Sequence, residues 1–150
     1  MAPRALLEYN IASGDDPGTK TDTAFRTLFP TVHNKYGYID FASWRNLHDI
    51  VATVAVKPVQ GLLLKLDYHL FLLPEPADGM FRASGAPLRA GAAGASHLAG
   101  HEIDFFGKYQ WNKWVGFLWG YSLFKGGEFF SDTGTNGTAH FLYAQTTASF

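Results

Sequence analysis

The stretch that decides the fold runs from Leu62 to Leu73 and reads LLLKLDYHLFLL. Every second residue from Leu62 onward is a leucine or Tyr68, whereas the residues between them include three polar ones, Lys65, Asp67 and His69. In a β-strand successive side chains point to opposite faces, so one face here would be wholly apolar and the other polar at its middle. A helix would scatter the three polar residues around its circumference. The pattern therefore predicts a strand.

The same two-residue period recurs along the chain and predicts six strands. We expect them over these ranges: Leu6–Ala12, Ile50–Val56, Leu62–Leu73, Glu102–Trp111, Val115–Phe124 and Phe141–Phe150. The connections alternate in length. Short turns are expected at 58–61 and 112–113, and long loops rich in Gly, Pro, Asp and Thr at 13–49, 74–100 and 125–138. Short turns on one side and long loops on the other are typical of outer-membrane β-barrels. We therefore predict an all-β antiparallel meander of about six strands, curved like part of a barrel wall.

Composition narrows the class of protein further. The chain has 150 residues, enough for one domain, with 12 Lys+Arg against 13 Asp+Glu and a formal net charge of -1, which disfavours a nucleic-acid partner. It has no cysteine, so disulfides, cysteine-based zinc sites and thiol catalysis are excluded. No secretory signal is expected at the N-terminus, because Glu8 and Asn10 interrupt its apolar residues. No run of about 20 apolar residues predicts a membrane-spanning helix.

Two arrangements of the apolar face fit the period equally well. In a soluble sandwich or lipocalin-like barrel that binds an apolar ligand, the apolar face points inward, whereas in a membrane barrel it faces lipid and the polar face lines a lumen. Three features favour the membrane barrel. Opposite charges sit mid-strand on the polar face, and the chain ends on an aromatic residue that closes an alternating strand. Aromatic residues also lie on the apolar faces, several near strand ends: Tyr68, Tyr109, Trp111, Trp119 and Tyr121.

A set of short motifs, in order along nearly the whole chain, resembles the C-terminal part of the alginate-export family of bacterial outer-membrane β-barrels. The matching residues are Glu8-Tyr9-Asn10, Ala12-Ser13-Gly14-Asp15, Leu28-Phe29-Pro30-Thr31, His33, Tyr36-Gly37, Asp40, Trp44, Asn46-Leu47-His48-Asp49, Lys57-Pro58, Asp67-Tyr68-His69, His101-Glu102-Ile103-Asp104, Tyr143-Ala144-Gln145-Thr146-Thr147 and Phe150.

The resemblance implies a single-chain barrel of about eighteen strands in the outer membrane, which passes an anionic polysaccharide or a similar solute. The chain begins inside the family pattern, and six strands are fewer than the eight that the smallest outer-membrane barrels need to close. We therefore interpret the chain as the C-terminal part of a larger barrel. Its expected partners are outer-membrane lipid, the remaining strands of the barrel and the transported solute.

Seven residues are candidates for lining the lumen and contacting the solute: Arg45, Lys65, Asp67, His69, Glu102, Asp104 and Lys108. Basic residues in a lumen would attract carboxylates. The competing and favoured interpretation is a cross-strand ladder of neutralising pairs, Lys65 with Asp67, and Lys108 with Asp104 and Glu102. The candidate acids and bases balance, so strong anion selectivity would have to come from elsewhere in the barrel.

Other chemistry is disfavoured by the residues present. Asp15, Asp16 and Asp22 do not follow the spacing of a calcium loop and indicate a solvated turn. His48 with Asp49, and His69 with Asp67, could take part in acid–base chemistry, but no motif places a nucleophile beside either pair. An outer-membrane hydrolase is thus a minor alternative, and no catalytic residue, metal or cofactor is expected. Asn46 to Asp49 are instead expected to tie the first long loop to the following strand through side-chain-to-backbone hydrogen bonds.

Overall fold

The computed structural model describes residues 3–29, 33 and 35–150, so two residues of the family motifs, Pro30 and Thr31, lie outside the described residues. Six long strands form the body of the molecule: β1 (Arg4–Ala12), β2 (Leu47–Val56), β3 (Leu62–Leu72), β6 (Leu98–Gln110), β7 (Val115–Gly126) and β8 (Thr138–Ala148). All six predicted strands are present. Most are longer than predicted, by two to four residues at the end that meets the long loops.

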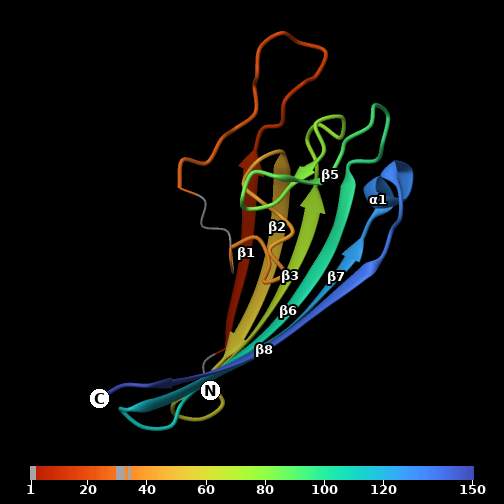
Figure 1. Cartoon of the computed structure of the whole chain (residues 1–150). Helices are drawn as coiled ribbons and strands as arrows, with labels where there is room; N and C mark the ends of the chain where they lie inside the picture. The colour runs from red at the N-terminus through yellow and green to blue at the C-terminus, as the bar shows by residue number, and fades with distance from the viewer. Residues whose placement is uncertain (1–2, 30–32, 34) are drawn as a thin grey trace.

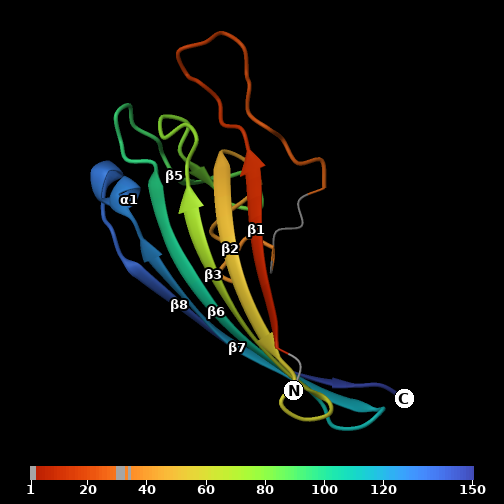
Figure 2. The same ribbon diagram turned by 180° about the vertical axis from the view of Figure 1, so that it is seen from behind.

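The six strands form one antiparallel sheet in the order β1-β2-β3-β6-β7-β8. The sheet is open, with β1 and β8 at its edges, and it curves and twists strongly from one edge to the other (Figures 1 and 2). The two short turns lie at one end, and the three long connections lie at the other. The predicted meander is confirmed, and its curvature is that of part of a barrel wall.

The apolar face of the sheet is the exposed one. On β3, Leu66 is 46% exposed and Tyr68 is 39% exposed, whereas Asp67 and His69 between them are each 3% exposed. A soluble barrel would bury Leu66 and expose Asp67, and the structure has the opposite arrangement. We call the exposed apolar face the outward face and the polar face the inward face.

The long connections contain structure that the two-residue period does not predict. The connection after β3 carries a small hairpin, β4 (Met80–Phe81) with β5 (Pro87–Arg89), and the connection after β7 carries a short helix, α1 (Glu128–Thr133). These loops meet the loop-side ends of the strands in one apolar core. Its largest fully buried apolar side chains are Phe71, Phe129, Leu47, Leu73 and Met80.

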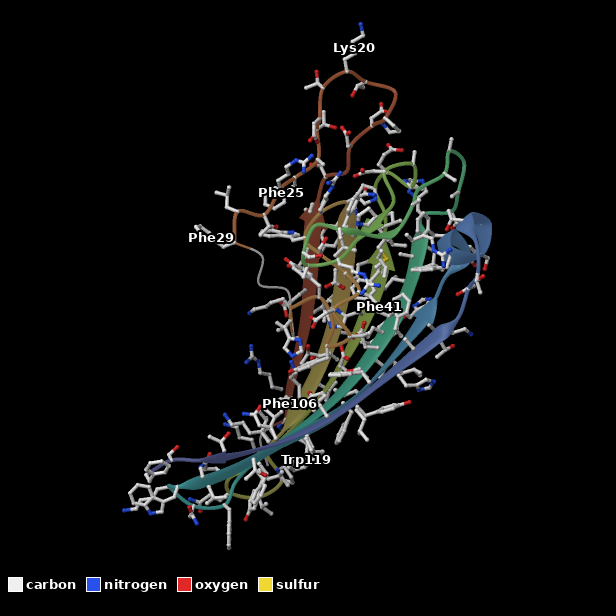
Figure 3. All side chains as sticks on the ribbon, viewed as in Figure 1. Lys20, Phe25, Phe29, Phe41, Phe106 and Trp119 are labelled. Carbon is white, nitrogen blue, oxygen red and sulfur yellow. The ribbon has the colours of Figure 1, made fainter. Side chains whose placement is uncertain are left out.

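The first long loop, between β1 and β2, has two parts. The first part projects beyond the strands, with Lys20 near its tip and Phe25 below it (Figure 3). The second part folds back over the inward face, so that Phe41 lies beside the middle of the sheet (Figures 1 and 3). There Phe41 packs edge-on against Phe124 of β7, with ring centroids 5.3 Å apart. This loop therefore covers much of the face that would line a lumen.

No helix in the described ranges has the length and apolar character to cross a membrane.

Candidate functional site on the inward face

Three neighbouring strands bring five titratable side chains together on the inward face beneath the first loop. In the strand register, His69 of β3 lies directly opposite Glu102 of β6, and Asp67 lies directly opposite Asp104. Asp49 of β2 completes the group from the other side of β3, and it is fully buried. Because alternate residues share a face, the spacing of two between these positions places all five side chains on the same side of the sheet.

The imidazole of His69 is held between two carboxylates. Its Nδ1 forms hydrogen bonds with Asp49 Oδ1 at 3.0 Å and Oδ2 at 3.1 Å. Its Nε2 lies 3.6 Å from Asp104 Oδ2. Both ring nitrogens thus face acids, and neither is directed at a hydroxyl that it could activate.

Asp67 has two partners of its own. Lys65 Nζ lies 2.6 Å from Asp67 Oδ2, and Thr53 Oγ1 donates to Asp67 Oδ1 at 2.6 Å. The predicted pairing of Lys65 with Asp67 is therefore confirmed. It occurs between two residues of the same strand, with Thr53 as the cross-strand partner.

Glu102 fastens the first loop to the sheet. This carboxylate is fully buried, and its Oε1 accepts a hydrogen bond at 3.0 Å from the backbone N–H of Ile39 in the loop. Gly37 allows the approach: its φ is +86°, and a Cβ at this position would lie 2.5 Å from the carboxyl carbon of Glu102. Glu102 Oε2 and both carboxylate oxygens of Asp104 have no hydrogen-bond partner within the described part of the chain.

Aromatic stacking fastens the loop at a second point, closer to the short-turn end. Tyr38 stacks on Tyr143 of β8 with centroids 5.5 Å apart and ring planes at 13°, and it lies 6.0 Å from the ring of Phe106 of β6. Tyr143 in turn lies over Gly120, whose missing side chain leaves the room. Burial raises the pKa of Tyr38, and raises that of Tyr36 to about 12, so both loop phenols stay neutral at ordinary pH.

Two of the predicted site residues lie apart from this group. Lys108 is exposed and forms no ion pair among the described residues, so the predicted ladder from Lys108 to Asp104 and Glu102 is wrong. The reason is distance along β6, because four residues of strand separate Lys108 from Asp104 by about 13 Å. Arg45 lies in the loops, where it pairs with Asp78 at 2.9 Å and covers the ring of Phe81.

Arg45 belongs to a second feature, which the two-residue period of the strands does not predict. We call it the arginine mouth: a hollow of about 260 Å³ among the long loops, lined by Arg26, Arg45, Arg82, Phe25 and Trp44 among others. Phe25 and Trp44 pack with ring centroids 4.8 Å apart. Arg26 pairs with Asp22 and lowers the pKa of that carboxyl. Arg82 is exposed and has no ion pair in the part of the chain that the structure describes. The three arginines are far apart in sequence, so no local motif marks them.

The inward strand positions do not carry the equal numbers of acidic and basic residues that the sequence led us to expect. Acids outnumber bases there, with Glu8, Asp49, Asp67, Glu102 and Asp104 against Arg4, Lys65 and Lys108. The basic character of the molecule lies instead in the arginine mouth.

A sheet that buries carboxylates on one face and exposes an apolar, aromatic-rich surface on the other defines the class of membrane β-barrels. Comparison with protein families then gives the particular group. Residues 1–144 match the alginate export family, so the chain belongs to that family. The family serves polysaccharide export across the outer membrane, which is transport and not an enzymatic reaction. Searches of the curated proteins and of the solved structures found no match.

Proposed function

We propose that this chain forms one wall of an outer-membrane channel through which an anionic polysaccharide, or a smaller anionic solute, passes. The observation that carries the proposal is the reversed burial of the sheet, with Leu66 and Tyr68 exposed and Asp67 and His69 buried. An apolar surface of this extent costs free energy in water and is stabilised in lipid.

The two features of the site have complementary roles in this proposal. The arginine mouth stands at the long-loop end, where guanidinium groups would gather carboxylate-bearing sugars and the Phe25–Trp44 pair would pack against sugar rings. The acidic wall beneath it holds the first loop in place through Glu102. Because the wall is acidic, it does not bind an anionic solute tightly, and weak binding favours conduction through the channel.

Arg82 provides the test because it is the arginine of the mouth whose charge is not already paired. With the full chain in detergent micelles, we expect acidic oligouronates to bind more tightly than neutral oligosaccharides of the same length. Arg82→Gln should weaken oligouronate binding about threefold to tenfold, because one charge-assisted contact is lost.

Lys20→Gln is the matched control. It removes one positive charge from the exposed tip of the same group of loops, away from the mouth (Figure 3), and should leave binding unchanged. Equal binding of acidic and neutral sugars, or equal losses in the two variants, would overturn the assignment of the mouth to an anionic solute.

A further inference from the structure

We propose that the outward face carries a binding site for the phosphate groups of membrane lipids, centred on Lys125 and flanked by His101 and His140. The proposal rests on the proposed function, because it requires the outward face to meet lipid. It assigns a lipid-binding role to outward residues that have no part in the inward carboxylate group or in the arginine mouth.

The site belongs to a repeated arrangement of tyrosine–histidine pairs on the outward face. A tyrosine hydroxyl lies 2.6 to 2.7 Å from a histidine Nδ1 in three pairs: Tyr9 with His48, Tyr68 with His101, and Tyr121 with His140. In every pair the histidine lies on the neighbouring strand, two residues from the position directly opposite the tyrosine. The pairs join β1 to β2, β3 to β6 and β7 to β8, so they occur once for every two strands. We call this arrangement the tyrosine–histidine belt.

The belt runs parallel to the rim of the sheet. From each pair to the next, the tyrosine lies two residues closer to the short-turn end. Across β2, Tyr9 is level with Leu70 of β3, which is two residues beyond Tyr68. Across β6, Tyr68 is level with Leu123 of β7, which is two residues beyond Tyr121. Two residues are about 6.6 Å, and two strand spacings are about 9.6 Å. When strands tilt by about 35° from the membrane normal, as in membrane barrels, a line parallel to the membrane crosses them with this ratio of shift to spacing. The strand ends shift in the same direction.

The height of the belt suits the boundary of the hydrocarbon layer. On β6, ten residues separate His101 in the belt from Trp111 beside the short turn, and Trp111 is largely exposed. Ten residues span about 33 Å of strand, which the same tilt of about 35° reduces to about 27 Å, close to the apolar band of about 25 Å in such barrels. The belt therefore lies at the level of the lipid head groups on the long-loop side.

Lys125 is the one charged side chain on the outward positions of the six strands, all of which the structure describes. It lies directly opposite His101 on β6 and diagonally across from His140 on β8. His101 and Lys125 also border a notch of about 280 Å³ that reaches up to Ser131 and includes one acid, Glu128. An isolated charge on a face that meets lipid is costly unless an opposite charge meets it there.

The chemistry of the histidines favours an anionic ligand. When the tyrosine O–H donates to Nδ1, the neutral imidazole carries its proton on Nε2. The structure gives Nε2 of His101 and His140 no partner among the described residues. Two N–H donors and an ammonium group on three adjacent strands match the oxygens of a phosphate, and the leaflet at this height supplies phosphate as a lipid head group.

The test uses the full chain in non-ionic detergent micelles and counts bound lipid by native mass spectrometry. We expect dioleoyl phosphatidic acid to bind at least tenfold more tightly than dioleoylglycerol, which lacks the phosphate. Lys125→Gln should remove about tenfold of that affinity, and His101→Gln a smaller part, whereas Lys113→Gln at the short turn should have no effect. Glu128→Gln should strengthen binding.

Two further arms separate the possible failures. Millimolar inorganic phosphate should not displace the lipid, and displacement would assign the site to free phosphate and overturn the proposal. Vesicles of brominated phosphatidylcholine test the proposed function itself, since outward tryptophans such as Trp119 should be quenched. Quenching without any preference for phosphatidic acid would refute the phosphate site alone, whereas absence of quenching would refute the membrane-facing wall on which it rests.

Discussion

At the scale of single residues, Gly37 and Glu102 decide whether the first loop stays on the inward face. Gly37→Ala would place a methyl group against the Glu102 carboxylate at a backbone φ of +86°, so the hydrogen bond from Ile39 should be lost. The matched control is Gly94→Ala, which has a similar φ of +77° but open space around it. Both variants pay the strain of a left-handed residue, and only Gly37→Ala also leaves a buried carboxylate unpaired. We expect urea unfolding in micelles to show an extra loss of about 1.5–3 kcal/mol for Gly37→Ala. Equal losses would show that Glu102 does not hold the loop.

Asn46 has the same role where the loop joins β2. It is fully buried, and its side chain bonds the backbone of the next loop at Glu75 O, Gly79 O and Glu75 N, with distances of 2.7, 2.7 and 2.9 Å. Asn46→Ala should destabilise the loops by roughly 2–4 kcal/mol, because one buried and two partly buried backbone groups lose their partners. Asn112→Ala in the exposed short turn, which removes two bonds to backbone N–H groups, should cost about 1 kcal/mol or less. Protease cleavage of the loops should accelerate in the first variant only, and the same rate in both would contradict this role for Asn46.

At the scale of elements, the two-residue period predicted all six long strands, because each strand has one apolar and one polar face over many residues. The period could not predict β4 and β5, which are too short to show one. It could not predict α1 either, because its adjacent Phe129 and Phe130 are both buried in the apolar core that the long loops form with the strand ends. In the site, Asp67, His69, Glu102 and Asp104 were predictable from their position on the inward face. The hydrogen bond between Asp49 and His69 was not predictable, because it depends on the register of two strands. The clustering of the three arginines was not predictable either, because it depends on how the long loops fold. Asn46 does make the predicted side-chain-to-backbone bonds, but they join the first loop to the loop after β3 and not to the following strand. His48 bonds Tyr9 and Asp49 bonds His69 instead.

At the scale of the whole molecule, the open sheet leaves β1 and β8 with one unpaired edge each. Unpaired backbone groups are very costly in lipid and prone to edge-to-edge pairing in water. Outside detergent micelles, we therefore expect the 150-residue chain alone to aggregate or to form oligomers joined at these edges, and not to form a conducting monomeric pore. Planar-bilayer recording combined with native mass measurement tests this. A stable unit conductance from a single 16.5 kDa chain would show that six strands can close a pore by themselves.

The central claim is that the outward face meets lipid and the inward face meets water, and spin labelling tests it most directly. Since the chain has no native cysteine, a single introduced cysteine carries a single label. Labels at Leu66→Cys on the outward face and Lys65→Cys on the inward face lie one residue apart on β3. In lipid vesicles we predict that the label at position 66 is relaxed mainly by oxygen, which concentrates in the hydrocarbon, and the label at position 65 mainly by a water-soluble nickel chelate. The reverse pattern, or equal access of the chelate to both positions, would contradict the account.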